Sequence, residues 1–263
     1  MKQIDFFQVD AFTNRAFGGN PAAVCFVEPG FDETLMQRIA AENNLAETAF
    51  VEKKVEGFNL RWFTPTVEVD LCGHATLAAA HVLWQAGVLG EDQAAEFTTR
   101  SGLLKAEKKG DWIELDLPTA TLTDVDLPKE IVKALNISPV NVVFAKDRYL
   151  IEVGSAREVE SIAPDFLSLR EFDMIVVTAK ADPQSPFDFV SRTFGPSVGI
   201  DEDPVTGSSH CGLVPYWSAK LGKGSLFAFQ ASKRGGELKL QSAGERVLIA
   251  GQAVTVIKGV FYP

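Results

Sequence analysis

The length, composition and charge of this chain are those of a soluble globular protein with two domains of ordinary size. Its 263 residues can bury two cores, and 46% apolar with 23% charged residues is typical of the globular class. A net charge of −10 argues against non-specific nucleic-acid binding and against an acidic membrane surface. The cysteines lack paired spacing and no apolar leader or spanning stretch occurs, so we expect a cytoplasmic protein with reduced thiols.

The first half of the chain predicts strands and one early helix. Strands are expected at residues 3–12, 22–27, 45–51 and 60–64. Asp32 is suited to cap a helix whose apolar stripe contains Leu35, Met36 and Ile39. Further short strands are expected at residues 95–99, 102–106 and 112–117. This half is therefore mostly sheet.

A second helix is expected near residues 74–86 and is central to this half. Its stretch from Ala75 to Val82 carries no charge and is rich in alanine and leucine, which indicates a helix buried on nearly all sides. Its first turn brings Gly73, the His74 ring and unpaired backbone N–H groups to one place. Such a helix start favours an anion.

The same pattern occurs a second time. The segment 61–67, Arg-Trp-Phe-Thr-Pro-Thr-Val, recurs at 192–198 as Arg-Thr-Phe-Gly-Pro-Ser-Val. Each copy is followed by an acidic loop and then by a glycine with a polar neighbour, Gly73-His74 or Gly207-Ser208, that opens a helical run. Chance similarity is the alternative, but the order of elements also repeats. We interpret the pattern as an internal duplication whose two helix starts face one cleft.

The second half predicts the same order of elements after a linker rich in Thr, Asp and Pro at 118–128. Strands are expected at residues 140–145, 149–153, 174–179 and 187–194, helical signals at 155–172, and a helix near 207–221 that Pro215 should kink. The expected fold is α+β, with two pseudo-symmetric domains, each a curled, mostly antiparallel sheet around a central helix. The domains are expected at 1–118 and 119–263, with the last strand able to pack on the first half.

Several motifs together resemble one known family. They are Asp10-Ala-Phe-Thr, Gly19-Asn-Pro, Leu45-Ala-Glu-Thr-Ala-Phe, Phe63-Thr-Pro, Cys72-Gly-His-Ala-Thr-Leu-Ala and Asp201-Glu-Asp-Pro-Val-Thr-Gly-Ser-Ser-His. In this order, over nearly the whole chain, they are similar to the PhzF-type phenazine biosynthesis family, which shares the diaminopimelate epimerase fold.

The resemblance implies a function and a set of site residues. It implies a cofactor-independent isomerase, usually a homodimer, with the active site between its two domains; in the phenazine enzyme the reaction is a proton shift on trans-2,3-dihydro-3-hydroxyanthranilate. Carried over by motif, the acid/base residue is Glu47, assisted by His74, Asp203 and Ser208, with Gly73 and Gly207 in the carboxylate-binding turns. No cofactor and no metal are implied. We expect a small carboxylate substrate, with no nucleic-acid or membrane partner.

The residues themselves support parts of this interpretation. Glu47 is an acid among small and apolar neighbours, and the corresponding strand near 174–178 has none, which suggests a proton-transfer residue whose pKa burial would raise. Alternatively it is a structural glutamate that pairs with an arginine or caps a turn. His74 could polarise the substrate or carry a proton, or be structural. Asp203 before a proline and Ser208 at a helix start are also common structural devices.

The other cysteines and histidines predict less. Cys72 invites comparison with two-thiol epimerases, but the second glycine turn has no cysteine, so a buried small residue is the simpler interpretation. His81 lies seven residues after His74 and is interpreted as a satisfied core histidine.

Three other classes of function stay open. A hydrolase could use Ser208, His74 and Asp203, but no Gly-x-Ser-x-Gly elbow is present. A metal site from His74, His81, His210 and a cysteine lacks any known ligand spacing. A non-catalytic small-molecule-binding or protein-interaction protein could retain the same cleft.

Overall fold

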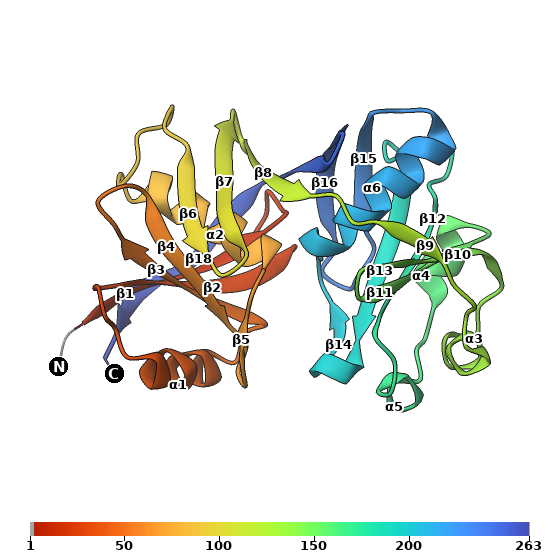
Figure 1. Cartoon of the computed structure of the whole chain (residues 1–263), viewed down its shortest axis with the longest axis horizontal. Coiled ribbons are helices and arrows are strands. Elements are labelled where there is room, and N and C mark those ends of the chain that lie inside the picture. The colour runs from red at the N-terminus through yellow and green to blue at the C-terminus, as the bar shows by residue number, and fades with distance from the viewer. Residues whose placement is uncertain (1–2, 263) are drawn as a thin grey trace. The chain divides into compact units, whose positions relative to one another are not determined.

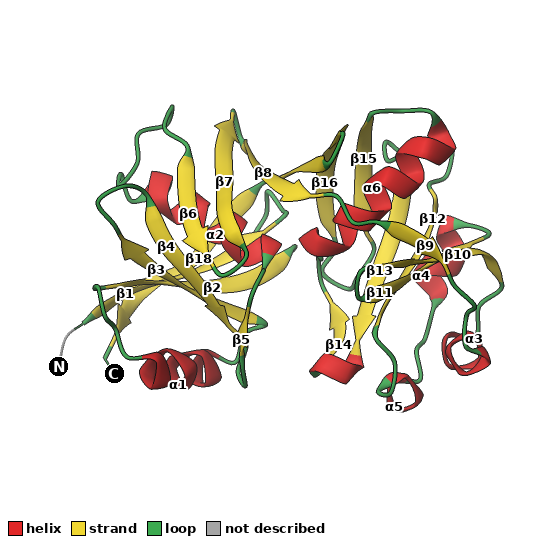
Figure 2. Ribbon diagram, in the orientation of Figure 1, coloured by secondary structure: helices red, strands yellow, loops and turns green. Residues whose placement is uncertain are grey.

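The computed structural model describes residues 3–262, and every structural statement below refers to these residues. The contacts divide the chain into two units. Unit 1 comprises Met1–Asp116 and Ala250–Pro263, and unit 2 comprises Leu117–Ile249. Each unit has its own strands and its own buried helix (Figures 1 and 2).

Unit 1 is a curled sheet in which most neighbouring strands are antiparallel. Its strands are β1 (Ile4–Ala11), β2 (Asn20–Val27), β3 (Glu47–Lys53), β4 (Phe58–Phe63), β5 (Glu68–Val69), β6 (Ala95–Thr99), β7 (Gly102–Lys109), β8 (Trp112–Pro118) and β18 (Ala253–Phe261). The chain's last strand, β18, pairs with its first, β1, and the two run side by side in Figure 1. The pairs β2–β3 and β4–β6 are parallel.

Two helices pack on this sheet. Helix α2 (Gly73–Gln85) buries nearly every residue against β1, β2 and β3, as its charge-free, alanine-rich sequence predicts. Helix α1 (Glu33–Asn43) begins at Asp32, whose carboxylate accepts a hydrogen bond from the Leu35 N–H at 2.9 Å. Its apolar stripe packs with Ile4 and Phe50 in a separate core cluster.

Unit 2 repeats this arrangement. Its strands are β9 (Leu122–Asp124), β10 (Pro139–Ala145), β11 (Arg148–Val153), β12 (Met174–Lys180), β13 (Phe189–Gly195), β14 (Ile200–Asp203), β15 (Ser225–Gln230), β16 (Gly236–Ala243) and β17 (Arg246–Gly251). Its helices are α3 (Lys129–Leu135), α4 (Ala156–Ser161), α5 (Phe166–Leu169) and α6 (Gly207–Leu221), with a 3₁₀ turn η1 (Pro196–Val198). Helix α6 is buried over much of its length and runs through Pro215.

The strand pairing of β1 to β7 recurs strand for strand in β10 to β16. The pairs β2–β3 and β11–β12 are parallel, β3–β4 and β12–β13 antiparallel, and β4–β6 and β13–β15 parallel. The repeated Arg-x-Phe segment even makes the same contacts: Arg61 and Arg192 each lie over the phenylalanine two residues later, at 5.1 and 5.0 Å. The duplication and the expected fold class are confirmed.

Local details differ from the sequence prediction. The helical signals at 155–172 form two short helices, α4 and α5, because Pro164 cannot continue a helix. Helix α3 was not predicted. No helix among residues 3–262 has the length and apolar character needed to cross a membrane.

Candidate active site

Glu47 is the first residue of β3 and lies at the edge of the unit 1 core. Its side chain is 12% exposed, and in the β2–β3 register it stands beside Ala22. The equivalent first residue of β12 is Met174, which stands beside Arg148. The acid therefore belongs to one unit alone, as its sequence context indicated.

His74 is the second residue of α2 and faces Glu47. Its Nε2 lies 3.2 Å from Glu47 Oε2, and the His74 side chain is 5% exposed. The contact is an ion pair when both groups are charged, and neither atom has a further hydrogen-bond partner within residues 3–262. A buried acid and an imidazole in contact, with no other partner for either atom, indicate a functional position. Unit 1 thus brings together two of the predicted site residues.

The other ring nitrogen of His74 has two neighbours. Asn20 Nδ2 lies 3.2 Å and Cys72 Sγ 3.4 Å from His74 Nδ1. Burial raises the pKa of the Cys72 thiol, and the Glu47 carboxylate acts in the same direction, so the sulfur keeps its proton at neutral pH. Burial opposes a charge on His74, but Cys72 and Glu47 beside the ring raise its pKa well above the ordinary value.

The same part of unit 1 also contains a candidate group of metal ligands. Glu47, Cys72 and His74 offer one ligand atom each, all within 4.8 Å of one another. However, Cys72 meets Nδ1 while Glu47 meets Nε2, and an imidazole binds an ion through only one of these nitrogens. The raised pKa of Cys72 also disfavours the thiolate that a metal needs. The donor arrangement therefore fits proton transfer better than ion binding.

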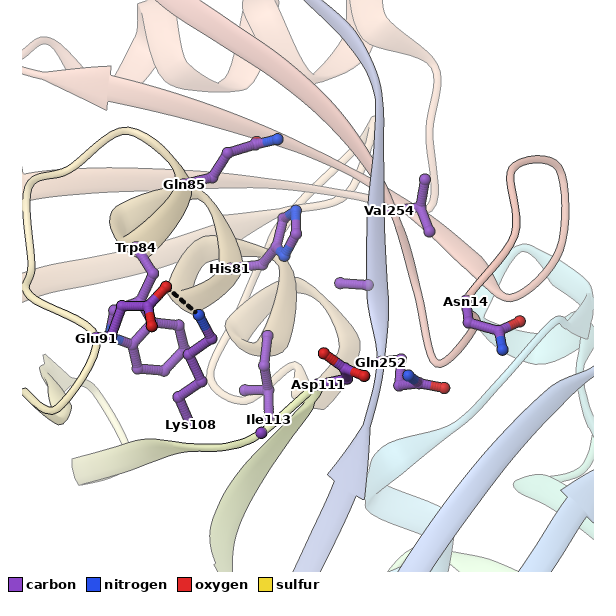
Figure 3. A pocket seen from close by; sticks show the side chains of 12 residues that line it. Asn14, His81, Trp84, Gln85, Glu91, Lys108, Asp111, Ile113, Gln252 and Val254 are labelled. Carbon is purple, nitrogen blue, oxygen red and sulfur yellow. Dashed lines mark hydrogen bonds and ion pairs between the residues drawn. The ribbon is translucent and has the colours of Figure 1, made fainter.

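His81 lies elsewhere in unit 1. It is about 10 Å further along the α2 axis than His74, and its Nε2 is 3.1 Å from Thr255 Oγ1. It lines a hollow of about 510 Å³, and Figure 3 shows the ion pair of Glu91 with Lys108 among the other lining residues. Burial and the Lys108 charge lower the pKa of His81 to about 4, so it is neutral at physiological pH.

In unit 2, Asp203 holds the turn that leads into α6. Thr206 Oγ1 donates to Asp203 Oδ2 at 2.6 Å. The Gln230 side chain accepts from the Thr206 N–H at 2.9 Å and donates to the Asp203 carbonyl at 2.8 Å. These bonds fix the buried Asp203 at the start of the helix.

Ser208 is the second residue of α6, the position that His74 occupies in α2. A nitrogen of the buried Arg148 donates to Ser208 Oγ at 3.1 Å and to Ser209 Oγ at 2.8 Å. These bonds do not favour the hydrolase alternative, because a nucleophilic serine needs a basic partner and Ser208 Oγ instead accepts from an arginine.

Both helices begin at a buried glycine. Gly73 and Gly207 are the first residues of α2 and α6, and neither N-cap residue, Cys72 or Thr206, forms a side-chain cap hydrogen bond. The first-turn N–H groups therefore lack the usual internal acceptor, which suits an anion.

Sequence reasoning missed three residues that contact the predicted ones, namely Asn20, Arg148 and Gln230. The Gly19-Asn-Pro motif contains Asn20, but no role of its own was predicted for this residue. Arg148 and Gln230 each stand at the end of a strand with no local signal, and their partners lie far along the chain.

Comparison with known proteins first gives the class of fold. The chain has the isomerase/epimerase-like fold: its structure matches a hydroxyproline epimerase of Agrobacterium vitis with a TM-score of 0.65, over 99% of this chain and 91% of that one. The sequence identity is 12%, so this likeness shows the fold alone.

The family follows from closer matches. The model of the phenazine biosynthesis-like protein family, PhzC-PhzF, matches residues 9–259, and the chain belongs to this family. It is 48% identical to an uncharacterized isomerase of Halalkalibacterium halodurans over 261 residues, 98% of each chain. A PhzF-family crystal structure from Enterococcus faecalis matches with a TM-score of 0.94 and 41% identity, covering 100% of both chains.

Proposed function

We propose that this protein is a cofactor-independent isomerase that moves a carbon-bound proton on a small carboxylate, with Glu47 as the general acid/base. The observation that carries the proposal is the buried contact of Glu47 Oε2 with His74 Nε2, 3.2 Å apart, in which neither atom has another hydrogen-bond partner among the described residues. The relatives named isomerases support the class of reaction.

Glu47 supplies the base. A largely buried carboxylate beside an imidazole can accept a proton from carbon and return it, because the proton moves over only a short distance. His74 Nε2 donates a hydrogen bond to the anion that forms, or returns the proton on its own side. Unit 2 has no acid at the equivalent position, so the proposed proton transfer uses Glu47 and His74 of unit 1.

The substrate carboxylate binds at a helix start. The α2 and α6 first turns offer N–H donors and the positive ends of the helix dipoles. Ser208, oriented by Arg148, adds a hydroxyl at the α6 start. Asp203, held by Thr206, sets the shape of the turn.

The test is exchange of a carbon-bound proton with D₂O across a panel of small carboxylates. Glu47→Gln should keep the fold, because the amide is nearly isosteric, and should lower exchange by about 10²–10⁴-fold. Glu52→Gln is the matched control: Glu52 is another largely buried acid of β3, paired with Lys54, and its loss should leave exchange unchanged.

Equal deuterium incorporation by the wild type and Glu47→Gln would remove Glu47 from the mechanism. A panel in which no carboxylate exchanges, while carboxylates still bind, would instead favour a binding protein that keeps the site.

A further inference from the structure

Asn20 is held rigidly beside the candidate catalytic histidine. It is the first residue of β2, is 0% exposed, and its Nδ2 lies 3.2 Å from His74 Nδ1 although 54 residues separate them in sequence. Gly19 before it has φ of 59°, and a Cβ there would lie 2.0 Å from the Ala11 carbonyl oxygen. Only glycine fits this turn, so the backbone of Asn20 has little freedom.

The neighbours of His74 Nδ1 decide which ring nitrogen carries the proton. The amide nitrogen of Asn20 can only donate. Cys72 Sγ, 3.4 Å away, is a thiol, because burial raises its pKa. Nδ1 therefore faces two donors and acts as the acceptor. The ring proton is left on Nε2, the nitrogen that faces Glu47.

We propose that Asn20 is a positioning residue that keeps the proton of the neutral His74 ring on Nε2 and directs Nε2–H at Glu47. The proposal rests on the proposed function. In that function Glu47 is the general base, and His74 Nε2–H is the hydrogen-bond donor. Glu47 and Cys72 beside the ring raise the pKa of His74 well above its ordinary value, and Asn20 decides which nitrogen keeps the last proton once the ring is neutral.

Unit 2 contains a similar contact between a strand side chain and the second residue of its helix, but with different residue types. Ser208, the counterpart of His74, is held by Arg148 from the strand β11, the counterpart of β2. In both units a buried polar side chain from this strand fixes the second residue of the helix. Only in unit 1 is the fixed group a titratable ring, and only there does the fixing side chain determine a protonation state.

The experiment is ¹⁵N NMR of the histidine rings in the full chain, which has three histidines. His81→Gln and His210→Gln assign the His74 signals. In the wild type above the pKa of His74, the proton should be on Nε2. In Asn20→Asp, a carboxylate at Nδ1 should move the proton to Nδ1 and raise the pKa of His74 by about 1–3 units.

Asn141→Asp is the matched control, because Asn141 contacts Tyr216 in unit 2 and should leave His74 unchanged. A wild-type ring protonated on Nδ1, or an Asn20→Asp ring with unchanged tautomer and pKa, would overturn the proposal. The wild-type spectrum decides even if Asn20→Asp does not fold.

The spectra need no substrate, so they separate this inference from the proposed function. If the tautomer is Nε2–H but Glu47→Gln exchanges as the wild type does, the function fails and the role of Asn20 stands. In an active enzyme, Asn20→Asp should lower kcat more than it raises KM and should move the acid limb of the pH profile upward.

Discussion

The buried histidine His210 should make unit 2 lose stability as the pH falls. Its ring is 0% exposed, and its Nδ1 donates to the Thr206 carbonyl at 2.8 Å. Burial, with a smaller contribution from the Arg148 charge, lowers the pKa of His210 to about 4, although the Thr206 bond opposes this. The unfolded chain, with an ordinary histidine pKa, therefore binds the proton first as the pH falls.

The magnitude follows from the two pKa values. Titration at about 4 in the folded state rather than near 6.5 in the unfolded state is worth about 3 kcal/mol in total. The free energy of unfolding is unaffected above about pH 6.5, falls below it, and reaches its full loss near pH 4. Between pH 7 and pH 5 the expected loss is about 2 kcal/mol.

The measurement is urea unfolding at pH 7 and pH 5 for the wild type and for His210→Gln. The glutamine keeps an N–H donor for Thr206 but does not titrate. The variant should lose about 2 kcal/mol less than the wild type over this range. His74 and the carboxylates are common to both proteins and cancel in the comparison. Equal losses would show that protonation of His210 does not destabilise unit 2.

Two further substitutions test packing and the repeat by urea unfolding. Arg192→Met should lower the free energy of unfolding by about 3–5 kcal/mol, because it leaves the partly buried Glu202 carboxylate without its guanidinium partner. Arg61→Met, at the equivalent position, should lower it less, because the Glu68 carboxylate still has Arg100 as a partner. Gly251→Ala should cost about 1–3 kcal/mol, because the new Cβ would lie 2.3 Å from a buried ring carbon, whereas Gly259→Ala faces open space and should be nearly neutral.

The fold could be predicted from the sequence because its signals are local or repeated. The charge-free run after Gly73 predicted a buried helix, and the recurrence of the segment 61–67 at 192–198 predicted the second copy. The structure adds the reason why the segment recurs: each arginine pairs with a carboxylate on the next strand and lies over a phenylalanine on its own. The recurring segment therefore corresponds to a recurring set of side-chain contacts.

The site could be predicted only in part. Glu47 and His74 were expected from their contexts, but their direct contact could not be, because 27 residues and two strands separate them. Asn20 was beyond the reach of sequence patterns for the same reason. Its role depends on a side chain meeting one ring nitrogen across the core, and no periodicity reports such a contact. The roles of all four predicted catalytic residues, Glu47, His74, Asp203 and Ser208, stay predictions.

The asymmetry of the two units extends beyond one residue. At the unit 2 position equivalent to Glu47, the strand register places Met174 beside Arg148, a buried guanidinium. An acid there would be held ionised by the adjacent positive charge, with its pKa lowered. In unit 1 the register partner of Glu47 is Ala22, which carries no charge. A proton-transfer acid is therefore compatible with one copy of the duplicated scaffold, and the other copy is built to hold a hydroxyl and a fixed positive charge at its helix start.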